Sequence, residues 1–424
     1  MLEALKTKTY NLLRWSEKYT RTDMVYLAKG GGWLSLGKAV SMTCAFILSI
    51  AFANLLPKEV YGNYKYVISA ISLLSLFTLS GMGTAMARSS AQGKDGSLDL
   101  AIKTEIKWGL LGGLLSALLA VYYWWNGNLI LSWSFGIVSI FVPFFNVYNL
   151  YASILQGKKR FDLLVRFEIF TQIINFILVL PIILLVQQVW ILIISYLFVN
   201  SWLQKSCLYL TKKTISFNDV QEHEVVSYGK NLSVLNVLNM GAALIDQILV
   251  FHFLGAVNMA IYNIALAPTE HLKSVFKMIG PLAFPKFAEQ KHDIPAGAMY
   301  KKMFKFGLVV LSVCLLYIVA APYLYSILFP AYQESVVYTQ ILAFSLIAIV
   351  NILPITALQA QMKTKKLYWW NSIVAIVQIL SVFIGVFYFG LMGAVLAKVF
   401  VRYFETLLIV FIVKNSIKYE PSRS

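Results

Sequence analysis

The sequence predicts an all-α polytopic membrane protein with about twelve transmembrane helices in two six-helix lobes. Three observations lead to this fold class: an apolar composition, an alternation of basic and uncharged gaps, and a faint internal repeat. Of the 424 residues, 59% are hydrophobic and 13% are charged, and the mean hydropathy is +0.71. A soluble chain of this length could not bury so much apolar side chain in one core, which favours a membrane protein.

Twelve apolar stretches are long enough to cross the hydrocarbon core, which takes about 20 residues in a helix. The predicted spans are residues 31–55, 61–83, 106–124, 129–154, 163–186, 190–211, 229–254, 259–283, 303–328, 335–360, 368–389 and 391–413. An even number of spans places both chain ends on one side of the membrane. The gaps on the opposite side are short, so no soluble domain is expected there.

Positive charge recurs in every second gap between the spans. The basic gaps lie at residues 88–107, 158–160, 212–213, 286–305 and 363–366. Short cytoplasmic loops retain Lys and Arg, so these gaps and both basic chain ends are predicted to be cytoplasmic. The net charge of +17 then belongs mainly to these loops, and it predicts anionic membrane lipids as partners and no nucleic acid.

An internal repeat divides the chain into two halves. Residues 56–64 and 254–262 each begin with Leu, turn, and reach Tyr eight positions later, at an offset of 198. Leu155-Gln156 and Leu358-Gln359 each precede a basic loop, at an offset of 203. Two parallel halves are a transporter architecture. The predicted domains are a cytoplasmic lead-in at 1–28, an N-lobe at 29–215 with helices 1–6, and a C-lobe at 216–424 with helices 7–12 and a short cytoplasmic tail.

Ionisable residues inside the spans are the candidate site. Each costs about 2.5–3.5 kcal/mol on insertion scales and usually faces a cavity or a partner. Glu270, Lys273 and Lys277 share one face at spacing i, i+3 and i+7, with surplus positive charge, so this face is predicted to line a water-filled cavity. The other substrate-binding candidates are Lys38, Lys65, Arg88 and Arg402. Asp246 and Glu270 are the candidates for binding a coupling ion, H+ or Na+.

Structural roles remain open for several of these charges. Arg402 and Glu405 could neutralise each other in an internal ion pair, and Asp246 could also be a packing residue. Lys38 and Lys65 could extend to the two membrane interfaces, and Arg88 could anchor its helix at the inner boundary.

No enzymatic or metal site is predicted. The chain lacks a phosphate-binding loop of the form G-x-x-x-x-G-K-[ST]. Its four histidines are scattered without metal-ligand spacing. No catalytic residue and no cofactor is therefore expected, apart from the coupling ion.

Short motifs along the chain carry a family resemblance. They are LLPKEVYGNY at 55–64, GMGTA at 81–85, LQG at 155–157, IDQIL at 245–249 and FLG at 253–255. With these motifs, residues 29–415 resemble the bacterial O-antigen flippases (Wzx/RfbX type) of the multidrug/oligosaccharidyl-lipid/polysaccharide exporter superfamily. The resemblance implies a MATE-like fold, with two lobes in a V and a central cavity lined largely by helices 1, 2, 7 and 8.

The resemblance also implies a function. It implies alternating-access transfer of undecaprenyl-diphosphate-linked oligosaccharide repeat units, of O-antigen or a related surface polysaccharide, from the cytoplasmic to the outer leaflet. Polysaccharide polymerase and chain-length proteins are implied as partners. A cationic cavity suits a diphosphate, because Lys and Arg bind phosphate by charge and hydrogen bonds.

Three alternatives remain. A drug/cation antiporter of the same superfamily would need an acidic or apolar cavity, which the surplus lysine opposes. An O-antigen polymerase or ligase would resemble its relatives in having a long outer loop, which the short gaps oppose. A scaffold of a polysaccharide assembly complex would not need a charged stripe in the membrane.

Overall fold

A computed structural model describes residues 24–220, 222, 224–280, 283, 287, 296–361 and 363–417. Within these ranges all the regular elements are helical. Most of the predicted lead-in and the basic residue Lys286 lie outside the described residues.

The N-terminal half contains the predicted spans 1–6. Its elements are α2 (Met24–Leu55), α3 (Lys58–Leu74), η1 (Ser75–Thr78), α4 (Met82–Ala91), η2 (Asp95–Ser97), α5 (Leu98–Trp125), α6 (Leu129–Phe141), η3 (Val142–Phe144), η4 (Val147–Asn149), α7 (Leu150–Gly157), α8 (Phe161–Leu185) and α9 (Val189–Thr214). The C-terminal half contains the remaining spans. Its elements are α10 (Glu224–Lys277), α12 (Ala296–Leu328), η5 (Pro330–Tyr332), α13 (Ser335–Ala343), η6 (Phe344–Asn351), α14 (Ile352–Ala360) and α15 (Thr364–Ile417).

The described residues contain enough apolar helix for twelve crossings. Nine helices are long and apolar enough to span a membrane, and the bent pair Lys58–Thr78 and Met82–Ala91 makes a tenth. Two of the nine, at 42 and 50 residues, are far too long for one crossing of a core about 30 Å thick. Each turns back at a glycine with left-handed backbone, Gly255 (φ 80°) in α10 and Gly390 (φ 60°) in α15. Dividing both there gives the predicted twelve and confirms the predicted fold class.

Some spans are less regular than the sequence predicts. The span predicted at 61–83 bends by 51° between η1 and α4, next to Leu79, whose φ is 62°. The span predicted at 129–154 is interrupted by η3 and η4, where Pro143 removes a backbone donor. Its counterpart in the second half is interrupted by η6. The breaks at 142–149 and 344–351 are 202 positions apart, close to the sequence repeat.

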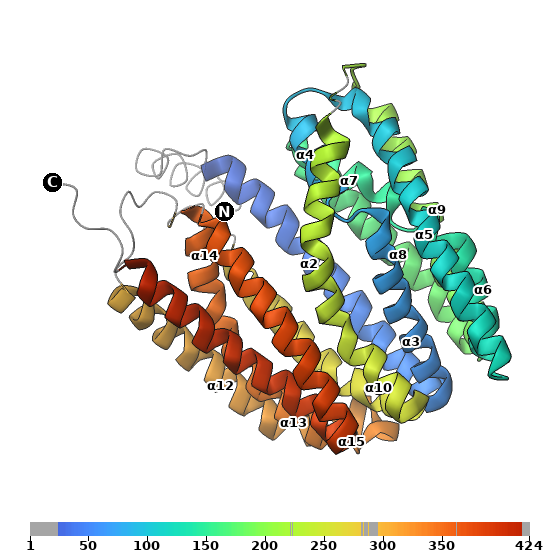
Figure 1. Cartoon of the computed structure of the whole chain (residues 1–424), viewed down its shortest axis with the longest axis vertical. Coiled ribbons are helices and arrows are strands. Elements are labelled where there is room, and N and C mark those ends of the chain that lie inside the picture. Colours follow the sequence, from blue (N-terminus) through green and yellow to red (C-terminus); the bar gives the residue numbers. More distant parts are fainter. Residues whose placement is uncertain are drawn as a thin grey trace, which may run out of the picture.

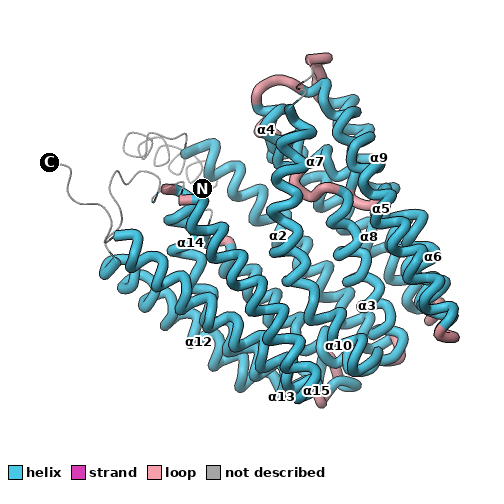
Figure 2. The backbone as a smooth tube through the Cα atoms, in the orientation of Figure 1, coloured by secondary structure: helices cyan, strands magenta, loops and turns pink. Residues whose placement is uncertain are grey.

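The helices form two groups that approach each other at one end (Figure 1). They converge where α10 and α15 turn, and they diverge toward the end where α2 begins and α15 ends. Figure 2 shows that short loops join the helices at both ends. The first part of α10, assigned to the C-lobe by sequence, lies against the N-terminal group: Gly81 N–H donates to Ser233 Oγ at 2.9 Å, and the Arg88 guanidinium lies 5.1 Å from the Tyr228 ring.

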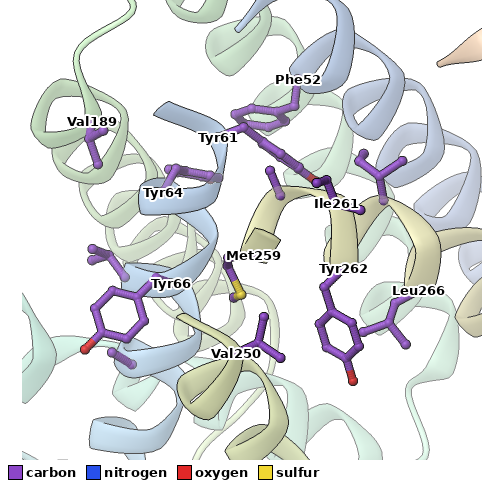
Figure 3. Packing of buried hydrophobic residues seen from close by; sticks show 14 of the residues in the cluster. Phe52, Tyr61, Tyr64, Tyr66, Val189, Val250, Met259, Ile261, Tyr262 and Leu266 are labelled. Carbon is purple, nitrogen blue, oxygen red and sulfur yellow. The ribbon is translucent and has the colours of Figure 1, made fainter. Parts of the chain in front are cut away.

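One buried aromatic and aliphatic cluster joins the two groups at their converging end. Figure 3 shows its centre, where residues of α3 face residues of α10. Tyr66 of α3 stacks on Phe251 of α10 at 3.8 Å between ring centroids, and Tyr61 meets Tyr332 edge-on at 6.4 Å. These rings exclude water from the converging end and give it the packing of a continuous core.

Polar contacts reinforce the same end. Lys58 of α3 forms an ion pair with Glu334, which follows η5. Asn54 Nδ2 of α2 donates to the carbonyl oxygen of Leu328 at 2.8 Å. Both contacts connect the N-terminal group to the C-terminal group, so this end is closed.

Candidate functional site

A pocket of about 240 Å³ lies in the C-terminal group, between the second part of α10, the η6–α14 segment and α15. Its charged lining consists of Glu270, Lys273, Lys277, Arg402 and Glu405. Three cations and two carboxylates give this lining a formal charge of +1. All five residues belong to helices that span the membrane, where an uncompensated charge is costly unless water or a ligand reaches it.

The stripe predicted on α10 lines this pocket. Lys273 Nζ donates to Glu270 Oε1 at 2.8 Å, and the Lys273 side chain is 6% exposed while that of Glu270 is 46% exposed. Lys277, one turn further along the same face, is exposed and forms no ion pair within the described ranges. The surplus charge of the pocket is therefore carried by Lys277.

The opposite side of the pocket is formed by α15 after its turn at Gly390. Arg402 Nη1 donates to Glu405 Oε2 at 2.9 Å. This is the internal ion pair that the sequence analysis gave as an alternative role for Arg402. The indole Nε1 of Trp370 donates to the backbone oxygen of Glu405 at 3.2 Å. Arg402 and Glu405 line the same pocket as Glu270 and Lys273, so the charges of α10 and α15 face one space.

Asp246 lies apart from this pocket in a fully buried ion pair. Lys398 of α15 donates to its Oδ2, and the Tyr262 hydroxyl donates to the same oxygen at 2.7 Å. The Gln247 backbone N–H donates to Oδ1 at 3.0 Å, so three donors satisfy the buried carboxylate and compensate part of its desolvation. Of the two roles considered for Asp246, the contacts favour the structural one, a link between α10 and α15.

The other three predicted cations do not line the pocket. The Lys65 ammonium lies 5.5 Å from the Tyr61 ring on α3, and Arg88 lies over Tyr228. Lys38 is exposed on α2. The structure therefore brings three of the six predicted cations together with Glu270, and it places the remaining three on separate helices.

Lys398 and Tyr262 were not assigned to the site from sequence. Lys398 is 152 positions from Asp246, and only the packing of α15 against α10 brings them together. The sequence feature that could have identified Lys398 is its position in an apolar span, four residues before Arg402. The described residues contain no group of three or more His, Cys, Asp or Glu side chains that could hold a metal ion.

Comparisons with known proteins agree with this architecture. A family model described as "Polysaccharide biosynthesis protein" matches residues 27–291, which is more than half of the chain. No curated protein sequence gives a significant match.

Several solved structures share the fold. The lipid II flippase MurJ in an inward closed conformation has a TM-score of 0.70 at 13% identity, over 90% of this chain and 87% of that chain. An inward-facing multidrug resistance MATE transporter of the MOP superfamily has a TM-score of 0.63 at 14% identity, over 90% and 96%. A MOP-superfamily transporter from Pyrococcus furiosus has a TM-score of 0.61 at 13% identity, over 92% and 96%.

Identities this low establish the fold alone, whereas the family match establishes membership. Together, the family and the fold confirm the sequence predictions of a multi-pass, MATE-like membrane protein and of a role in polysaccharide biosynthesis. The chain belongs to the polysaccharide biosynthesis protein family.

Proposed function

We propose that this protein is a flippase for undecaprenyl-diphosphate-linked oligosaccharide repeat units. It moves them from the cytoplasmic to the outer leaflet of the bacterial inner membrane by alternating access, with both chain ends in the cytoplasm. Its family and its structural similarity to a lipid II flippase support a lipid-linked substrate. Polysaccharide polymerase and chain-length proteins are the expected partners.

The observation that carries this proposal is the positively charged pocket inside the membrane-spanning helices. Lys273, Lys277 and Arg402 line a space inside the membrane-spanning helices whose charged residues sum to +1. Lysine and arginine bind phosphate oxygens through charge-assisted hydrogen bonds. A pocket of this sign suits a diphosphate and disfavours the cation that a drug/cation antiporter would carry.

We assign the remaining predicted cations a role in contacting the substrate between the two helix groups. With the basic gaps in the cytoplasm, the diverging end of the molecule faces the cell interior, where Arg88 would meet the incoming substrate. Lys38 and Lys65 would meet it deeper, toward the closed end. Outward movement of a negative charge gains about 2.3 kcal/mol per charge per 100 mV when the interior is negative. The membrane potential therefore favours export of a diphosphate.

Coupling to H+ or Na+ is proposed at Glu270. Its carboxylate pairs with Lys273 in the structure and is half exposed to the pocket. A diphosphate that binds Lys273 competes with Glu270 for the same ammonium. The released carboxylate can then bind a proton or Na+, which would link substrate occupancy to ion binding. Asp246, with three donors already bound, is the weaker candidate for this role.

The proposal is tested by the double variant Lys273→Ala/Lys277→Ala in a flippase-deficient strain panel with defined repeat units. We expect at least a tenfold loss of surface polysaccharide at unchanged membrane levels of the protein. Lys301→Ala/Lys305→Ala is the matched control, because these lysines have the same spacing on α12, are exposed, and do not line the pocket. Export at the wild-type level by the Lys273/Lys277 variant would overturn the assignment of the pocket.

A further inference from the structure

We infer that the C-lobe pocket binds the junction between the diphosphate and the polyprenyl chain, rather than the sugars. This inference rests on the proposed function and adds to it a division of the pocket into two chemically different walls. One wall, from α10 and α15, holds all the charged residues and is net positive, and the other, from η6 and α14, is mainly apolar, with Ser345 and Asn351 as its polar members.

The apolar wall is an ordered row of side chains. Ile349, Ile352 and Ile355 line the pocket at successive spacings of three residues, and each is only half-buried. Ile349 lies near the end of η6 and Ile352 begins α14, and residues three positions apart in a helix lie on the same face. Three isoleucines lie opposite three cations and two carboxylates, so the pocket is amphipathic and net positive. A ligand with an apolar part next to an anionic part would match it.

A polar group completes the apolar wall at its start. Ser345 also lines the pocket, and its residue is 1% exposed. Its hydroxyl oxygen has no hydrogen-bond partner within the part of the chain that the structure describes. Buried hydroxyls are nearly always paired, and a hydroxyl can donate to a phosphate oxygen. The unpaired Ser345 hydroxyl is therefore available to a ligand on the side of η6.

The pocket is too small to enclose an oligosaccharide of several sugars. At about 240 Å³ it lies below the range of about 300–1,000 Å³ that holds a whole drug-sized ligand. A diphosphate with the first carbons of an isoprenoid chain is a small amphipathic group of the right kind, whereas a repeat unit of several sugars is too large. The sugars must lie outside, so this pocket recognises the lipid carrier and contributes little to sugar specificity.

Binding to the purified full-length protein in nanodiscs separates these alternatives. The probes are geranyl diphosphate, inorganic pyrophosphate and a nucleoside diphosphate sugar (a nucleotide sugar). Each buried methylene raises affinity about fourfold, so burial of two or more methylenes makes geranyl diphosphate bind at least tenfold more tightly than pyrophosphate. The nucleotide sugar, which lacks an apolar chain, should bind no more tightly than pyrophosphate.

Two variants test which wall binds the apolar chain and which wall binds the diphosphate. Ile352→Ser/Ile355→Ser should weaken binding of geranyl diphosphate at least tenfold more than that of pyrophosphate. Lys273→Ala/Lys277→Ala should weaken both ligands alike. Ile173→Ser/Ile177→Ser on α8 is the matched control, because these isoleucines are exposed and lie outside the pocket.

Equal affinities for geranyl diphosphate and pyrophosphate in the wild-type protein would overturn the inference. An isoleucine variant that weakens both ligands equally would do the same. If export is lost in the lysine variant while the two probes bind equally, the flippase proposal stands and only the junction is wrong. If the probes behave as expected but the lysine variant exports normally, the pocket binds the junction and its proposed role in export is wrong.

Discussion

Gly62 is the position at which the closed end can be opened by a single methyl group. It lies in the first turns of α3, directly against the backbone of Ala256, where the second part of α10 begins. A Cβ built on Gly62 would be 2.5 Å from the Ala256 carbonyl carbon and closer still to its oxygen. Gly62→Ala therefore places a methyl group between the N-terminal and the C-terminal helix groups.

The size of the effect follows from this geometry. Ordinary contact begins at 3.4 Å, so the two backbones must separate by at least about 0.9 Å from the 2.5 Å position. The obstructing atoms are backbone atoms and cannot rotate away, unlike the end of a side chain. Overpacking of this kind costs about 1–3 kcal/mol. At about 1.4 kcal/mol per factor of ten, the upper value lowers the population of the closed end about 100-fold.

Spin labels measure this population directly. Labels at Glu59 and Gln333, both exposed on opposite sides of the closed end, are introduced after replacement of the three native cysteines. Double electron–electron resonance should show a short distance in the wild-type background and a shift to longer distances in Gly62→Ala.

Gly136→Ala is the matched control, because a Cβ there meets nothing within 4 Å. It should leave the distance distribution unchanged. If folded Gly62→Ala protein keeps the wild-type distances, α3 and α10 can adapt without separating, and the reasoning above is refuted.

Two further predictions concern ion pairs between helices. For the partly exposed pair Lys58–Glu334, Lys58→Glu should favour opening of the closed end by at most about 1 kcal/mol. The exchanged pair Lys58→Glu/Glu334→Lys should restore the spin-label distances. If it does not, this ion pair does not stabilise the closed end. For the buried pair, Asp246→Ala leaves Lys398 uncompensated and should destabilise the protein by about 3–5 kcal/mol in denaturation experiments, while Asp246→Ala/Lys398→Met should recover much of this loss. Equal stability of the single and double variants would contradict the ion-pair explanation.

The crossings could be predicted from sequence because each depends on local composition. A stretch of about 20 apolar residues must form its backbone hydrogen bonds internally, and in lipid a helix does this within one segment. The breaks were harder to predict. Leu79 adopts φ 62° without being glycine, and η6 extends over eight residues without an obvious helix breaker at its start. Such local geometry depends on neighbouring helices rather than on propensity.

The candidate site divides in the same way. Glu270, Lys273 and Lys277 could be grouped from sequence, because residues three and four positions apart share one face of a helix. The meeting of this face with Arg402 and with the isoleucines of η6 and α14 could not be predicted, because these segments are far apart in the chain. Lys38, Lys65 and Arg88 have the same residue types as the pocket cations, yet the packing places them elsewhere.

Sequence by itself determined that the chain is an all-helical, multi-pass membrane protein, predicted about twelve crossings in two related halves, and showed that one helix face carries surplus positive charge. Apolar length, helical spacing and loop charge are local properties, and hydrocarbon leaves a chain few ways to satisfy its backbone. Only the tertiary structure decided which charges neutralise each other and which remain for a ligand. Asp246 is paired with Lys398, whereas Lys277 is left unpaired among the described residues. That difference arises from contacts between helices, where a few ångströms decide whether a buried charge has a partner.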